Sequence, residues 1–246
     1  MLALVALSVL IGALSQRITG MGFALVASPL IVILLGPFDG VLVVNLCGVI
    51  SAALIIPRVW RHIEWRTLAW LAIPAVVTIV PASFLVTRLP GPITQLSIGI
   101  LVLVALTATL LIRRSERVVP ARPAAILAGA ASGFMNTAAG VGGPAISIYA
   151  VIMRWPQVNF AATLQPYFVI VGVTSLVTKA LFSGGMLPEL DALSWVIIIS
   201  SLLVGLVFGE VLNRHVSHRA ARIAVIIIAY VGGTVAVIDG GLGLAA

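Results

Sequence analysis

Charged residues are what this sequence has least of. Only 9% of its 246 residues are charged, whereas a soluble domain carries about 25%. This scarcity excludes an ordinary soluble fold. The 61% hydrophobic composition and the mean hydropathy of +1.24 indicate an all-α, multi-pass protein of the plasma membrane, surrounded by the lipid bilayer. The net charge of +7 then reflects arginines in cytoplasmic loops and not a nucleic-acid partner.

Side chains that hold metals or perform catalysis are also scarce. Cys47 is the only cysteine, which excludes an internal disulfide and is typical of a packing residue. His215 and His218 lie three residues apart, but no cysteine or acidic cluster completes a metal site. The sequence contains no Walker motif and no dinucleotide fingerprint. We therefore expect no enzymatic activity, no cofactor and no metal site, and a metal-ion permease is disfavoured.

Six apolar segments are long enough to cross a membrane, which takes about 20 residues of helix. Acidic residues are missing from their middles, since Asp39 and Glu210 lie near the ends, so a carboxylate proton relay or a sodium site is not supported. The predicted spans are Asp39–Pro57, Thr67–Thr87, Ile93–Ile112, Asn159–Leu181, Ala192–Leu212 and Ala221–Ile238.

Two further regions contain apolar runs that are too short to span. Leu2–Ser15 and Ala24–Leu35 are separated by QRITGMGF, and MNTAAGVGG separates Ala124–Phe134 from Pro144–Met153. Runs of about 10–14 residues are typical of reentrant segments. The first run lacks the positively charged start of a signal peptide, so we interpret it as part of the membrane domain. A full crossing by each broken region stays open as the alternative.

The two broken regions begin two similar stretches of sequence. A glycine breaker, a proline before the next span and the first intramembrane amide recur at nearly constant offset. Such internal repeats are typical of transporters. We predict two repeats, residues 1–117 and 118–246, which together form one transmembrane domain; each comprises a broken helix or reentrant hairpin followed by three transmembrane helices. The aligned residues are Gly22 with Gly142, Pro37 with Pro156, and Asn45 with Gln165.

The distribution of positive charge favours inverted repeats. If each broken region enters and leaves on one side, each repeat crosses an odd number of times and the second is inverted. Eleven arginines then lie inside, while Arg88 and Lys179 lie outside; parallel repeats give eight against five. Lys179 is near the outer end of its span, so its side chain is expected to extend to the interface. The inside residues are Arg58, Arg61, Arg66, Arg113, Arg114, Arg117, Arg122, Arg154, Arg214, Arg219 and Arg222.

Broken helices at membrane depth indicate a binding site, because irregular backbone is tolerated there only in a protein interior or beside a cavity. A half-helix starting at Val141, and another after Gly22, would direct free backbone N–H groups toward a small anion at the midplane. Arg17 either pairs with this anion or extends to the interface. The predicted binding residues are Gln16, Arg17, Thr19, Gly20, Gly22, Asn45, Asn136, Thr137, Gly140, Gly142, Gly143, Pro144 and Gln165.

These features have a second interpretation. Glycines in membrane helices also permit close packing, and the amides of Asn45 and Gln165 also suit hydrogen bonds between helices. The alternative to a transporter is therefore a membrane scaffold or assembly protein in which the glycines serve packing only. The sequence is compatible with either a monomer or a homo-oligomer.

Two stretches, ALSQRITGMGFALVASPLIVILLGP and GAASGFMNTAAGVGGPAISIYAV, resemble the paired repeats of the TauE/SafE sulfite exporter family. The resemblance covers nearly the whole chain and implies a secondary transporter or permease for a small anion, such as sulfite or a sulfonate-related compound; a small carboxylate is the alternative cargo. Phe23 replaces a third glycine of the family pattern, which narrows the expected cavity on one side. The implied site elements are Gly20, Gly22, Gly140, Gly142, Gly143 and Pro144.

Overall fold

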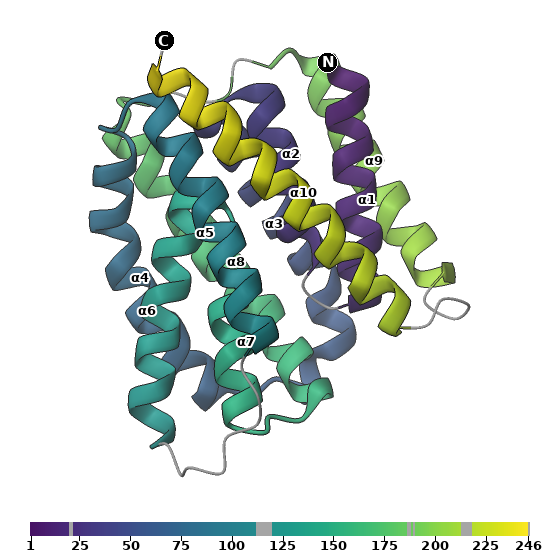
Figure 1. The fold of residues 1–246 in the computed structure, drawn as a ribbon. Coiled ribbons are helices and arrows are strands. Elements are labelled where there is room, and N and C mark those ends of the chain that lie inside the picture. The colour runs from purple at the N-terminus through teal and green to yellow at the C-terminus, as the bar shows by residue number, and fades with distance from the viewer. Residues whose placement is uncertain (20–21, 112–119, 186–187, 189, 213–217, 246) are drawn as a thin grey trace.

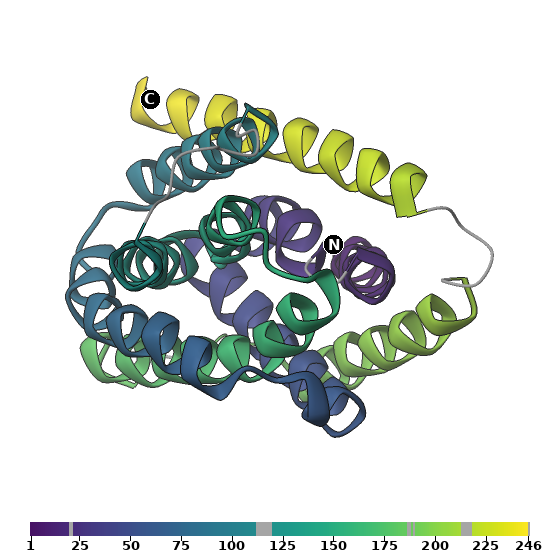
Figure 2. The same cartoon turned by 90° about the horizontal axis from the view of Figure 1, so that it is seen from below.

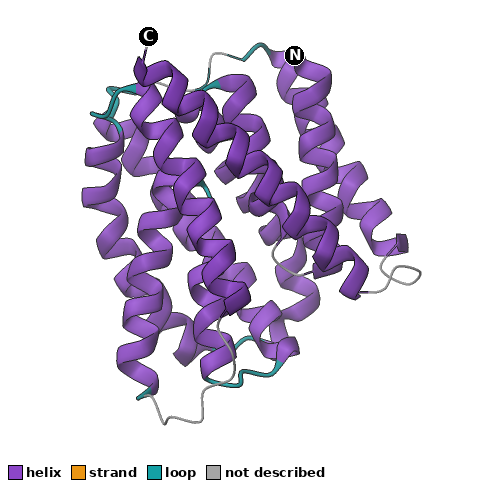
Figure 3. Ribbon diagram, viewed as in Figure 1, coloured by secondary structure: helices purple, strands orange, loops and turns teal. Residues whose placement is uncertain are grey.

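The protein is a bundle of helices. The computed structural model describes residues 1–19, 22–111, 120–185, 188, 190–212 and 218–245, and every regular element in them is helical (Figure 3). The elements in Figure 1 are α1 (Leu2–Thr19), α2 (Gly22–Leu35), α3 (Pro37–Val59), α4 (Trp65–Val86), α5 (Gly91–Leu111), α6 (Ala121–Ala139), α7 (Gly143–Ile152), α8 (Gln157–Phe182), α9 (Ala192–Leu212) and α10 (His218–Ala245), with a short 3₁₀ helix, Trp60–His62, after α3.

The six predicted spans are confirmed as helices that are long and apolar enough to cross a membrane: α3, α4, α5, α8, α9 and α10. The boundaries of five agree with the sequence to within two residues. The exception is α10, which starts earlier than predicted and continues through a glycine-rich stretch to Ala245. The chain is therefore an all-α polytopic membrane protein.

The four short apolar runs form two pairs of neighbouring helices, α1 with α2 and α6 with α7. The predicted lengths were wrong for α1 and α6, which have 18 and 19 residues. Polar residues that the sequence suggested as helix ends, such as Gln16 and Asn136, continue the helices instead. Both side chains are buried within the protein, where polar groups find partners that lipid does not offer.

The two helix pairs lie between two outer layers of helices (Figure 2). Seen from below, α5 and α10 run side by side along one edge, with α1, α2, α6 and α7 between them and the layer that contains α4, α8 and α9 (Figure 2). The first helix of each pair packs against a helix from the other half of the chain: α1 packs along α9, and α6 packs along α4. The irregular backbone between α6 and α7, residues 140–142, is therefore enclosed by protein.

Glycines allow the closest of these helix contacts. A Cβ atom at Gly133 of α6 would lie 2.7 Å from the Cα atom of Ala75 on α4, and one at Gly205 of α9 would lie 2.7 Å from the carbonyl oxygen of Leu10 on α1. Backbone atoms cannot yield to such an approach, so both positions exclude any side chain. These two glycines, which lie outside the helix breaks, therefore serve helix packing.

Candidate functional site

The break between α6 and α7 is built by glycine. Gly140 has a φ of +70°, and its N–H donates to the carbonyl oxygen of Asn136 at 2.8 Å, which ends α6. Few residues other than glycine adopt this conformation at low cost. The chain then turns back along α6, where Ser132 Oγ donates to the carbonyl oxygen of Gly142 at 2.7 Å. The helix α7 begins at Gly143, two residues after the predicted start at Val141.

The break between α1 and α2 includes Gly20, which lies outside the described residues. Thr19 is the last residue of α1 and Gly22 is the first residue of α2. The helix α2 therefore starts within a few residues of the end of α1, and its first turn contains Phe23 and Leu25.

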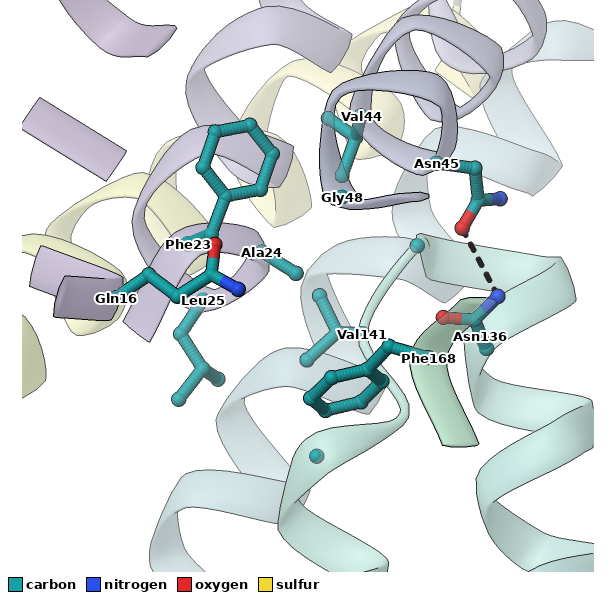
Figure 4. A pocket seen from close by; sticks show the side chains of 12 residues that line it. Gln16, Phe23, Ala24, Leu25, Val44, Asn45, Gly48, Asn136, Val141 and Phe168 are labelled. Atoms are coloured by element: carbon teal, nitrogen blue, oxygen red, sulfur yellow. Dashed lines mark hydrogen bonds between the residues drawn. The ribbon is translucent and has the colours of Figure 1, made fainter. Parts of the chain in front are cut away.

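A cavity of about 40 Å³ lies between the two breaks (Figure 4). Each water molecule needs about 10–15 Å³ on this measure, so the cavity has room for about three or four waters or a comparably small solute. The first residues of α2 and α7 contribute to its wall, and first-turn N–H groups have no partner within their own helix. The lining residues are Gln16, Phe23, Ala24, Leu25, Val44, Asn45, Gly48, Asn136, Gly140, Val141, Gly143 and Phe168.

Three side-chain amides face this cavity from different helices. Asn136 Nδ2 of α6 donates to Asn45 Oδ1 of α3 at 2.9 Å, and Asn45 Nδ2 is 3.4 Å from Ser175 Oγ of α8. On the opposite side, Ser51 Oγ donates to Gln16 Oε1 at 2.8 Å. Figure 4 shows the amides of Gln16 and Asn136 approaching the cavity from its two sides. Among the described residues, the lining has hydrogen-bond donors but no charged side chain.

Several lining residues occupy corresponding positions in the two halves of the chain. Sequence analysis identified the amides but missed Gly48 and Phe168, although the offset of 120 residues relates them to each other. Three such pairs line the cavity, and in two of them a glycine in one half of the chain corresponds to a phenylalanine in the other half. The pairs are Gln16 with Asn136, Phe23 with Gly143, and Gly48 with Phe168.

Four predicted site residues are buried beside the cavity without lining it. Gly142 packs on α6, because a Cβ there would lie 2.6 Å from Ser132 Oγ. Pro144 stands in the first turn of α7, where its missing N–H is not needed. Gln165 Nε2 donates to the carbonyl oxygen of Ala161 at 2.9 Å. Gln165 Oε1 and Thr137 Oγ1 have no hydrogen-bond partner among the described residues.

Arg17 is engaged by the protein itself. Its guanidinium donates to Glu210 Oε2 of α9, and Arg58 of α3 approaches the same oxygen at 3.3 Å. The side chain of Arg17 is 19% exposed, against 43% for Glu210 and 68% for Arg58. Neither interpretation from the sequence describes this arrangement, in which one carboxylate joins two cations where α1, α3 and α9 end. The cluster carries a net positive charge next to the cavity residue Gln16.

The family model described as Sulfite exporter TauE/SafE matches residues 4–235, which include both breaks and every cavity-lining residue. The chain belongs to the TauE/SafE family. No curated protein and no solved structure matched it.

Membership of the TauE/SafE family makes the protein an integral membrane transporter, and its six apolar spans agree with a multi-pass location in the plasma membrane. The family consists of transporters, in agreement with the expectation that the chain is not an enzyme. Among the described residues, no group of three or more histidine, cysteine or acidic side chains could hold a metal ion.

Replacing Glu210 with glutamine is expected to destabilise this TauE/SafE protein by about 1–2 kcal/mol, because Arg17 loses its carboxylate while staying largely buried. Thermal unfolding of the purified protein in detergent measures the change. Replacing Arg58 with glutamine is the control, since Glu210 then keeps its less exposed partner. Equal stability of the wild type and Glu210→Gln would show that the cluster does not hold these helices together.

Proposed function

We propose that the protein is a secondary transporter that moves a small sulfur oxyanion, such as sulfite, through the cavity between the two helix breaks. The observation that supports this most directly is the meeting of three side-chain amides with the first residues of α2 and α7 in one cavity. An oxyanion presents several acceptor oxygens, which match these donors. Helix N-termini add a partial positive charge that favours an anion.

The neutral lining suits transport better than permanent binding. A transported ion must be held strongly enough to enter and weakly enough to leave. Amide and backbone N–H donors bind an anion without a formal opposite charge, and the nearest cation in sequence to the lining, Arg17, is already paired with Glu210. We propose that the binding residues are the amides Gln16, Asn45 and Asn136 with the glycines of the two breaks.

We further propose that residues 1–117 and 118–246 are inverted repeats whose relative movement exposes the cavity to either side in turn. Two features support this arrangement. The lining residues pair at a constant offset of 120, and the packing of α1 on α9 has its counterpart in the packing of α6 on α4. Central sites between broken helices of two repeats are typical of secondary transporters.

Sulfite is expected to raise the thermal unfolding temperature of the purified protein, because a ligand that binds only the folded state stabilises it. The screen compares sulfite, sulfate, thiosulfate, sulfoacetate, acetate and a no-anion control at constant ionic strength. Flux of labelled sulfite into proteoliposomes, driven by an anion gradient, then tests transport itself. A response to acetate alone would favour a carboxylate as cargo. No stabilisation and no flux with any of these anions would contradict the proposed function.

A further inference from the structure

Lys179 is a fully buried lysine in the last part of α8. It is 0% exposed, and its Nζ has no hydrogen-bond partner among the described residues. The Nζ atom lies over the ring of Phe38 on α3, 5.9 Å from its centroid. The expectation that this side chain extends to the interface was therefore wrong, because α3 and α8 enclose it.

The lysine lies along the same contact between α3 and α8 as the cavity residue Asn45. Asn45 of the cavity lining contacts Ser175, which precedes Lys179 by one turn on the same face of α8. On α3, Phe38 precedes Asn45 by two turns. With a rise of 1.5 Å per residue, the four residues along α8 and the seven along α3 place Lys179 about 6–10 Å beyond the amide cluster. It therefore stands between the cavity and the end of the bundle where α3 begins and α8 ends.

An ammonium group in this position lacks the partner that its burial requires. An unpaired charge within a membrane bundle is costly, and intramembrane cations usually pair with an acidic group or a substrate. Ser175, one turn before the lysine, contacts Asn45 of the cavity lining, so polar side chains lie between Lys179 and the cavity.

We propose that Lys179 is the cationic anchor of a second anion-binding position, which the small oxyanion occupies on its way between the cavity and this end of the bundle. The inference rests on the proposed function, since it assigns a further position to the same cargo. Lys179 donates charge-assisted hydrogen bonds to the oxyanion there, and the oxyanion supplies the missing negative charge.

The test replaces Lys179 with methionine, which is unbranched and one atom shorter and removes the charge. We expect the sulfite concentration at half of the maximal thermal stabilisation to rise about tenfold or more. The reason is that charged hydrogen bonds contribute strongly to affinity. Without sulfite, the unfolding temperature should be unchanged or higher, because a buried unpaired charge has been removed. Lys179→Arg should retain the response to sulfite, and Lys179→Gln serves as a second neutral variant.

Arg88→Met is the matched control, because it removes an exposed positive charge from the same end of the bundle. Arg88 stacks on Phe84, which in turn contacts Phe182 at the end of α8. Proteoliposomes of known orientation add a second measurement: Lys179→Met should weaken the apparent affinity for sulfite more on the face where α8 ends than on the opposite face. A purely structural lysine would not produce this difference between faces.

The outcomes separate the two proposals. Suppose that sulfite stabilises the wild type and that Lys179→Met changes the apparent affinity for sulfite equally on both faces. The second position is then refuted, and the proposed function stands. If Lys179→Met and Arg88→Met lose affinity equally, general surface charge explains the effect and the second position is again refuted. If the wild type responds to no anion in the panel, the proposed function fails and this inference fails with it.

Discussion

Replacing Gly48 with leucine is expected to abolish sulfite flux while the protein remains folded. Gly48 lines the cavity from the middle of α3, and a Cβ atom there would meet no other atom within 4 Å. The leucine side chain therefore extends into free space, which amounts to only about 40 Å³ in the cavity. Stability should not fall, because replacing glycine inside a helix favours the helix by up to about 1 kcal/mol. Flux into proteoliposomes and thermal unfolding measure the two effects.

Gly241→Leu provides the matched control. Gly241 also lies within a helix, α10, and a Cβ there also meets nothing within 4 Å, but the residue does not line the cavity. Its flux should equal that of the wild type, while Gly48→Ala should retain part of the flux. A folded Gly48→Leu protein with wild-type flux would show that the anion takes another route. Gly142→Leu is a poorer test, since its side chain would collide with Ser132 and disturb the fold.

Replacing Asn136 with aspartate is expected to lower the affinity for sulfite by roughly a thousandfold. The change exchanges the amide nitrogen that contacts Asn45 for a carboxylate oxygen of the same size. Two negative charges about 4 Å apart repel by about 4 kcal/mol at an effective dielectric constant of about 20, which corresponds to that loss. Thermal unfolding at increasing sulfite concentration measures the affinity.

Asn159→Asp is the control for this charge change. Asn159 lies in the first turn of α8 and outside the cavity lining, where a helix N-terminus accommodates a negative charge. Its sulfite affinity should stay within a few-fold of the wild type. If Asn136→Asp binds sulfite as tightly as the wild type, the amide does not face the anion, and the proposed site must be moved.

The membrane spans could be predicted because each one is marked by a continuous stretch of its own sequence. A membrane crossing requires a length of apolar sequence, and six such lengths are evident. The end of α10 was not predictable, because Gly240 and Gly243 suggest a stop. In the bundle, a Cβ at Gly240 would lie 2.5 Å from the backbone nitrogen of Leu96, and Gly243 lies against Pro92. These glycines serve the contact with α5, which exists only in three dimensions.

The candidate site was predictable in part for the same reason. Gln16, Asn45 and Asn136 are polar residues in apolar surroundings, which marks them in the sequence, and the structure places all three at one cavity. The pairing of Arg17 with Glu210 and the enclosure of Lys179 depend on contacts between distant helices. A sequence does not state which helices will be neighbours, so Arg17 was interpreted from its place beside the first break and Lys179 from its distance to a span end.

The packing of α1 against a helix from the other half of the chain has a consequence for biosynthesis. Arg17 and Glu210 are 193 residues apart, so α1 leaves the ribosome long before its neighbour α9 has been made. The early pair α1 and α2 must stay in the lipid incompletely enclosed until nearly the whole chain has been translated, whereas α6 finds α4 already inserted. A nascent chain that stops before α9 therefore leaves Arg17 without its carboxylate partner, Glu210.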